Sequence, residues 1–344
     1  MIELFESPLS WGEKRRKFNE LTKDLTPEEK LECYSVFLSK LAPQGTEQWK
    51  AERKIGGSIA HKILTKPAEA HKLITGKKKF AGNLDTQWGN MMEVVAMKYF
   101  EPLKIYHFGS IPGFGFVGEE VITSYSPDGI FVGNEKFGVP GKICLLEIKC
   151  PSKRASGEGV PECYVPQIQM GLASTICELC VYSEFYIKAC SVADFNFGRD
   201  YSASFSKYRV KNNPIAIGFV SFSGEFASAD PIAMKNWMPS HTQKLLESRM
   251  PKFDGIDFGS TVNIFYKSGI LNKYEYDRKY SELLFNGDPI EFFEREWTRL
   301  GGAGVLCYKI FEVKIINVDK VDFRKEITQI VKFASDIFSA TAKN

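Results

Sequence analysis

The stretch that most limits how this chain can fold is a nearly apolar run, residues 143–150, that carries two charges. Its length and composition predict a short buried β-strand. Because strand side chains alternate between the two faces of a sheet, Glu147 and Lys149 should point one way and Ile148 the other. An isolated buried charge is costly, so these two side chains must pair with each other or bind something else.

Two shorter strands and a turn lead into this run. Residues 121–125 and 130–132 are rich in strand-forming side chains, and Ser126-Pro127-Asp128-Gly129 between them is typical of a turn. Gly138, Pro140 and Gly141 break the chain before the last strand begins. We therefore predict the order strand, turn, strand, turn, strand for residues 121–150.

Metal-assisted phosphodiester hydrolysis would use the polar groups of this stretch. The carboxylates of Asp128 and Glu147 are hard oxygen ligands suited to Mg²⁺, and the backbone carbonyl of Ile148 could add a third. A bound ion would polarise a phosphate and generate hydroxide from water. Lys149 could position or deprotonate that water, or offset charge on the phosphate. From these residues alone, a structural ion pair beside an ordinary turn remains the alternative.

Another candidate site precedes this stretch, at Arg53 and Ile55-Gly56-Gly57-Ser58. Glycines followed by a serine N-cap would leave backbone N–H groups free at a helix start, which suits a phosphate. The planar guanidinium of Arg53 could clamp the same phosphate. A plain turn and helix cap is the commoner meaning of such a sequence.

Two predicted helices carry further candidate side chains. Residues 86–100 have helical periodicity, with Glu93 beside the apolar stripe on a face that also holds Gly89. A second helix begins near Pro166, in Tyr164-Val-Pro-Gln167-Ile-Gln169, after a polar loop at 151–162. Taken alone, Glu93 and Gln167 would be ordinary exposed side chains.

The remaining elements complete a division of the chain into three parts. Residues 1–25 are charged and are expected to be irregular, and Thr26-Pro-Glu-Glu29 begins a helix of a small N-terminal helical lobe, 1–43. A core, 44–195, has the order αβββαβ and predicts a mixed central sheet flanked by helices. A C-terminal elaboration, 196–344, should contain strands at 214–222 and 305–318, and helices at 230–250 and 319–339.

Composition limits the partners and the compartment. The net charge is only +3, so a nucleic-acid surface must come from local basic clusters at residues 14–17, 77–79 and 149–154. No apolar run approaches membrane-spanning length, and the first residues do not form a signal peptide. The eight cysteines lack a regular spacing, which indicates reduced thiols in a cytoplasmic compartment.

The cysteine pair Cys177-Glu-Leu-Cys180, followed by Cys190, needs separate consideration as a cofactor site. A single Cys-x-x-Cys with no clear fourth partner is weak support for an iron–sulfur cluster or zinc, and buried thiols are common. We expect neither cofactor.

Taken together and in order, these motifs resemble the lambda exonuclease and YqaJ-type viral recombinase group of the PD-(D/E)xK nuclease superfamily. The likeness is greatest to lambda-like exonucleases of large cytoplasmic DNA viruses. It covers residues 44–190 by motif, with a weaker likeness at 305–340. The members of the pattern, in chain order, are Trp49, Arg53, Ser58, Glu93, Ser126, Asp128, Glu147, Lys149, Tyr164 and Gln167.

The resemblance implies a restriction-endonuclease-like fold and a role for each motif. Asp128, Glu147, the Ile148 carbonyl and Glu93 would serve a two-ion Mg²⁺ site, with Mn²⁺ as a substitute. Lys149 would activate water, and Tyr164 and Gln167 would lie at the scissile phosphate. The set implied to hold the 5′-phosphate of the digested strand is Arg53, Ser58 and Ser126.

The function expected from this resemblance is 5′ to 3′ digestion of one strand at double-stranded DNA ends, leaving 3′ single strands for recombination or repair. Expected partners are DNA ends, a single-strand annealing protein and further copies of the chain, a trimer by resemblance only. The expected location is the cytoplasm, that of the host if the protein is viral. The alternatives are a structure-specific endonuclease of the same fold and an inactive module that binds DNA ends.

Overall fold

The computed structural model describes most of the chain outside its C-terminal half. The described residues are 1–42, 46–48, 55–76, 88–89, 92–93, 95–97, 99–100, 103–113, 123–152, 157–190, 216–222, 263–266 and 304–341. For 189–190, 216–222, 263–266, 304–309 and 338–341, the description covers the backbone only. Several expectations lie outside the described residues: Trp49, Arg53, the basic clusters at 77–79 and 153–154, and the helix at 230–250.

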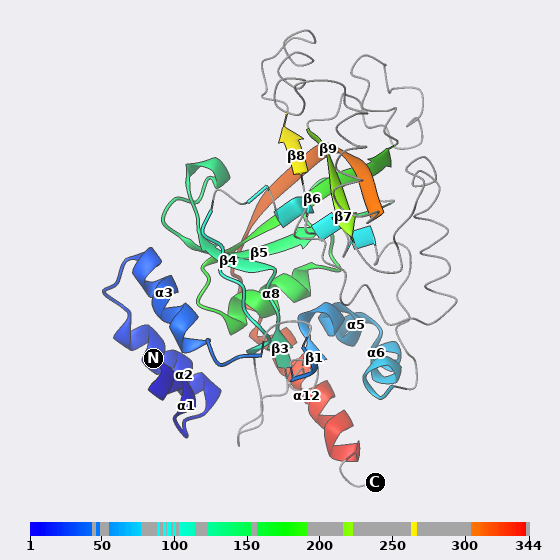
Figure 1. Cartoon of the computed structure of the whole chain (residues 1–344). Helices are drawn as coiled ribbons and strands as arrows, with labels where there is room; N and C mark the ends of the chain where they lie inside the picture. The colour runs from blue at the N-terminus through cyan, green and yellow to red at the C-terminus, as the bar shows by residue number, and fades with distance from the viewer. Residues whose placement is uncertain are drawn as a thin grey trace.

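A six-stranded mixed sheet forms the centre of the molecule, in the order β4-β5-β6-β9-β7-β8 (Figure 1). Its strands are β4 (Gly129–Val132), β5 (Ile143–Lys149), β6 (Leu179–Cys190), β7 (Ala216–Phe222), β8 (Asn263–Tyr266) and β9 (Gly304–Asp319). β5 and β6 run parallel, and the other neighbouring pairs run antiparallel. The predicted mixed sheet is confirmed, as are strands close to the expected positions 143–150, 214–222 and 305–318.

The C-terminal strand lies inside this sheet. β9 pairs with β6 on one side and with β7 on the other, so that Glu184 lies opposite Lys314. Residues far apart in sequence therefore share the sheet that carries Glu147 and Lys149. The division of the chain into three parts remains a prediction.

A small second sheet stands beside the first. It has the order β1-β3-β2, from β1 (Ile55–Gly56), β3 (Thr123–Tyr125) and β2 (Ile111–Pro112). β1 runs parallel to β3, with Gly56 opposite Ser124, and β2 runs antiparallel to it. This sheet brings the segments before Ser58, after Ser110 and before Ser126 to one place.

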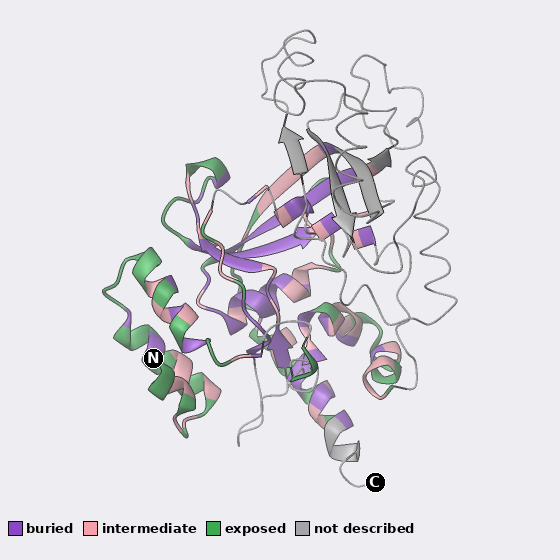
Figure 2. Cartoon of the chain, viewed as in Figure 1, coloured by how far each residue is buried: buried purple, intermediate pink, exposed green. Residues whose placement is uncertain are grey.

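Helices cover both faces of the large sheet. The face that carries Leu145 packs against α8 (Val165–Ser174), while Leu146 and Ile148 face a cluster that includes Trp88, Met92 and Val95. Residues 88–89, 92–93 and 95–97 are helical, as the periodicity of 86–100 predicts. β5 is thus buried on both faces, as Figure 2 shows, which explains its nearly continuous apolar sequence.

The N-terminal lobe is helical from its first residues. It consists of α1 (Ile2–Glu6), α2 (Trp11–Leu21) and α3 (Pro27–Phe37). α3 begins at the capping box of Thr26 and Glu29, as predicted. The expectation that residues 1–25 are irregular was wrong, because Ser10 and Glu13 form a second capping box that starts α2. Aromatic side chains of the lobe join the core on the α8 face of the sheet.

The C-terminal helix packs against the helices that follow β1. These elements are η1 (Gly57–Ile59), α5 (Ala60–Thr65), α6 (Pro67–Ile74) and α12 (Arg324–Thr341). Ile330, Val331 and Ala334 of α12 share a buried cluster with Ile63 and Met170. α12 occupies most of the range expected for the closing amphipathic helix. Among the described helices, none is long and apolar enough to cross a membrane.

Candidate active site

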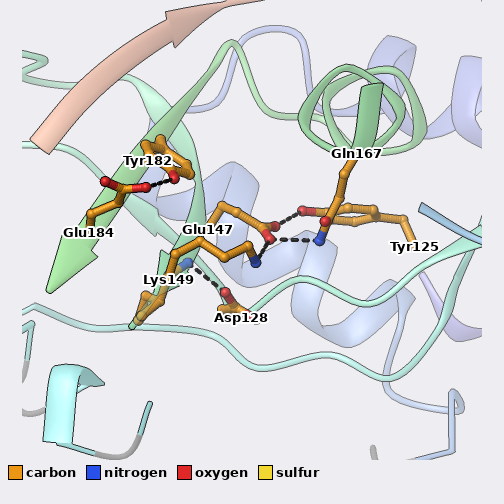
Figure 3. Close-up of polar contacts among 8 residues, drawn as sticks. Tyr125, Asp128, Glu147, Lys149, Gln167, Tyr182 and Glu184 are labelled. Carbon is orange, nitrogen blue, oxygen red and sulfur yellow. Dashed lines mark hydrogen bonds and ion pairs between the residues drawn. The ribbon is translucent and has the colours of Figure 1, made fainter. Parts of the chain in front are cut away.

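Glu147 is the centre of a buried network of polar side chains. It lies on β5 and is 1% exposed. Its Oε2 accepts a 2.5 Å hydrogen bond from Tyr125 Oη, and its Oε1 accepts a 2.6 Å bond from Gln167 Nε2 and another from Lys149 Nζ (Figure 3). β3, β5 and α8 therefore each bring a donor to one carboxylate.

Asp128 lies next to this carboxylate because its own side chain ties the turn after β3 to β5. Its Oδ2 accepts a 2.6 Å hydrogen bond from the backbone N–H of Ile148. The antiparallel pairing of β4 with β5 places Gly129 opposite Leu146, so the turn lies against the second half of β5. On the other side of the turn, His107 Nδ1 lies 3.1 Å from the Asp128 carbonyl oxygen.

Glu93 belongs to the same electrostatic group. Burial raises the pKa of Asp128 well above its usual value, and the charges of Glu93 and Glu147 raise it further. The pKa of Glu93 is raised by burial, with Lys149 opposing the shift and Glu147 adding to it. Glu93, Asp128 and Glu147, from three separate segments of the chain, thus all interact electrostatically with the ammonium group of Lys149.

Lys149 is held as a cation in this field. Burial alone would lower the pKa of its ammonium group, but the charges of Glu147 and Asp128 outweigh burial and raise that pKa. The ammonium also lies 5.2 Å from the centre of the Tyr164 ring, within cation–π distance. Lys149 is therefore well placed to stabilise negative charge.

The donor set suits a divalent cation. Asp128, Glu147 and Glu93 offer hard carboxylate oxygens whose mutual repulsion one lysine offsets only in part. In the conformation seen here, the contacts of Glu147 are to protein donors. No group of three or more His, Cys, Asp or Glu side chains within the described part of the chain is already arranged as a metal cage.

Two glycines let the surrounding elements approach closely enough to form the network. A Cβ at Gly171 of α8 would lie 2.6 Å from Tyr125 Cζ and 2.8 Å from Leu145 Cδ2. A Cβ at Gly57 would lie 3.0 Å from Tyr125 Cδ2. The contacts at Gly171 are shorter than carbon atoms tolerate and the contact at Gly57 is tight, so glycine at these positions lets α8 and η1 close around Tyr125.

The serines expected at a terminal phosphate lie at the end of the small sheet. Gly56 pairs with Ser124, so the chain enters Gly57-Ser58 beside Tyr125-Ser126. Ser58 is exposed within η1 and does not cap a helix. The interpretation of Ser58 as an N-cap was therefore wrong, because the chain turns through a 3-10 helix before α5 begins.

Two residues near this network were not among the site residues expected from the sequence. Tyr125 had been assigned only to a strand, although its hydroxyl bonds Glu147. Ser110 Oγ lies 2.9 Å from Ser126 Oγ, because β2 pairs antiparallel with β3. The alternation of β3 could have placed Tyr125 on an inward face, but no local signal links residue 110 to residue 126.

The cysteine pair lies in the core. Cys177 and Cys180 are buried free thiols, and Cys177 lies just before β6 whereas Cys180 lies at its start. Burial raises the pKa of the Cys177 thiol to about 12. The pKa of the Cys180 thiol is also raised, mainly by burial and secondly by the charge of Glu147. The side chain of Cys190 lies outside the described residues.

Residues 48–178 match the YqaJ-like viral recombinase domain. Similar solved structures include two of LHK-Exo, an alkaline exonuclease from Laribacter hongkongensis, one of them in complex with dAMP. Each is 23% identical, covers 41% of this chain and 74% of the other, and has a TM-score of 0.31. No curated protein matches significantly. For residues 48–178, this domain match agrees with the family expected from the motifs.

Proposed function

Because this chain carries a YqaJ-like viral recombinase domain over residues 48–178, we propose that it is a metal-dependent exodeoxyribonuclease acting on DNA ends. It degrades one strand of duplex DNA from 5′-phosphorylated ends, in the 5′ to 3′ direction, and leaves 3′ single strands for recombination or repair. The observation that carries this proposal is the convergence of Lys149 and Gln167 on one oxygen of buried Glu147, next to Asp128.

Four groups would hold the metal. They are the carboxylates of Asp128, Glu147 and Glu93 and the backbone carbonyl of Ile148. Mg²⁺, with Mn²⁺ as a substitute, would when bound polarise the phosphate and lower the pKa of water. A second ion is part of the proposal, as the resemblance to the nuclease family implies.

The protein's own groups position the substrate and stabilise charge. Lys149 activates the attacking water or, as an ammonium, offsets the charge that develops on the phosphate. The amide of Gln167 orients a water or a phosphate oxygen by hydrogen bonding, and the Tyr164 ring supports Lys149. Ser58 and Ser126, with Arg53, hold the terminal 5′-phosphate.

Digestion of defined DNA substrates in Mg²⁺ tests the proposal. Linear duplexes with a 5′-phosphate and with a 5′-hydroxyl are compared, with a covalently closed circle alongside. Rapid loss of the phosphorylated strand alone is the expected result. Cutting of the circle would favour the structure-specific endonuclease, and binding without cleavage in Mg²⁺ or Mn²⁺ would favour the inactive end-binding module.

A matched pair of lysine variants tests the role of Lys149. Lys149→Ala should fold normally and lose roughly 10²-fold or more in rate, the scale of a lost acid–base or electrostatic contribution. Lys142→Ala removes an exposed lysine just before β5 and should leave the rate unchanged. Near-normal digestion by Lys149→Ala would remove Lys149 from the mechanism.

Assembly is a separate part of the proposal. We propose that the chain forms a homo-oligomer around DNA and passes its 3′ strand to a single-strand annealing protein. A closed ring would be a symmetric oligomer of defined mass. Size-exclusion chromatography with light scattering, with and without duplex DNA, would measure that mass, and a monomer in both conditions would contradict the ring.

A further inference from the structure

A buried carboxylate with no part in the proposed chemistry lies one strand away from Lys149. Glu184 of β6 is 1% exposed, and the parallel pairing of β5 with β6 places it opposite Lys149. Its Oε1 accepts a hydrogen bond from Tyr182 Oη, and its Oε2 accepts one from Tyr186 Oη. Since a buried carboxylate is costly without donors, each of these hydrogen bonds stabilises Glu184.

A continuous path of contacts leads from this carboxylate to the active site. The Tyr182 ring lies 6.0 Å from the Tyr164 ring, with an angle of 36° between their planes. The Tyr164 ring in turn lies 5.2 Å from Lys149 Nζ. Figure 3 shows the Tyr182–Glu184 pair beside the Lys149–Glu147 contact. Both separations are within the range of favourable aromatic and cation–π contacts.

These contacts matter because the Lys149 end of the path is flexible, whereas the Glu184 end is fixed. The ammonium of Lys149 is carried on a flexible four-carbon chain, so its position depends on what it touches. Tyr164 is the N-cap residue of α8, and its ring contacts both the Lys149 ammonium and the Tyr182 ring. Tyr182, by contrast, is fixed at both ends, by the β6 backbone and by its hydrogen bond to Glu184.

We propose that Glu184 is a positioning residue for Lys149, acting through Tyr182 and Tyr164. The carboxylate fixes the phenol of Tyr182, the Tyr182 ring sets the Tyr164 ring, and the Tyr164 ring supports the ammonium of Lys149. This inference rests on the proposed nuclease function, in which Lys149 offsets charge at the phosphate.

Two phenylalanine substitutions test it with matched chemistry. Tyr182→Phe and Tyr186→Phe each remove one phenolic donor to Glu184 and keep the ring, so a purely structural role predicts the same effect for both. We expect Tyr182→Phe to lower the single-turnover cleavage rate roughly 10-fold, because small misplacements of a catalytic group are costly. Tyr186→Phe should cleave at close to the wild-type rate.

Affinity and coupling supply two independent readouts. The dissociation constant for a 5′-phosphorylated duplex, measured in EDTA by fluorescence anisotropy, should be the same for both variants and wild type. In a Tyr164→Leu background, Tyr182→Phe should cause no further loss of rate, because the path to Lys149 is already broken. Additive losses in that background would contradict transmission through Tyr164.

The outcomes separate this inference from the proposed function. Equal slowing of the Tyr182→Phe and Tyr186→Phe variants, or weaker DNA binding at an unchanged rate, would overturn the positioning role and leave the nuclease intact. A wild-type protein that cleaves no DNA would overturn the proposed function, and this inference with it.

Discussion

The hydroxyl of Tyr125 should be a large single contributor to the stability of the site. Tyr125→Phe removes the 2.5 Å hydrogen bond to Glu147 Oε2, while the ring keeps its packing against Gly57 and Gly171. Because Glu147 is 1% exposed, water cannot readily replace the donor. A hydrogen bond to a charged group contributes about 1.5–3 kcal/mol, so we expect the free energy of unfolding to fall by about 2 kcal/mol.

Tyr34 provides the control for this substitution. It is equally buried, but its hydroxyl has no hydrogen-bond partner among the described residues. Tyr34→Phe should therefore leave stability unchanged or raise it slightly. Urea unfolding of both variants in EDTA would compare their midpoints at equal m-value. If the Tyr125→Phe midpoint falls no further than that of Tyr34→Phe, the hydroxyl of Tyr125 does not support Glu147 as the structure indicates.

Three more substitutions or labelling experiments probe other parts of the site. Asp128→Asn should have a higher melting temperature than wild type at neutral pH in EDTA. Adding Mg²⁺ should raise the melting temperature of this variant less than that of wild type. The reason is that burial and neighbouring carboxylates raise the pKa of Asp128 in the folded state, so its ionisation as pH rises costs stability; an unchanged melting point would contradict this. Ser110→Ala should narrow the difference in cleavage rate between 5′-phosphate and 5′-hydroxyl duplexes, because the Ser110 hydroxyl contacts that of Ser126. An unaltered ratio of these two rates would show that the contact plays no part in substrate recognition. Exposed Cys163 should react with iodoacetamide in the native protein, whereas burial and a pKa raised to about 12 should protect Cys177 until unfolding, as mass spectrometry of the labelled peptides would show.

Local patterns predicted individual elements well. The capping box at Thr26 and Glu29 starts α3, and the proline at 166 lies in the first turn of α8. Such signals depend on residues within one turn of each other, so they can be read directly from sequence. The missed capping box at Ser10 and Glu13 shows that the same signal is easily overlooked in a charged segment.

Long-range pairing was much harder to foresee. A strand was expected near the position of β9, but nothing local indicates that it pairs with β6 inside the sheet rather than at its edge. Ser110 and Ser126 likewise meet only because β2 and β3 pair in one register. Register follows from burial and packing across the whole sheet, and these are not properties of either strand alone.

The sequence by itself determined the chemistry available at the site. Strand alternation puts Glu147 and Lys149 on one face, and the order of the motifs indicates the family that residues 48–178 match. Only the tertiary structure decided which donors surround Glu147, and that Glu184 is buried beside the active site with two tyrosines. The physical reason is that periodicity acts between neighbours in sequence, whereas a buried charge is tolerated only where the packed fold brings distant donors to it.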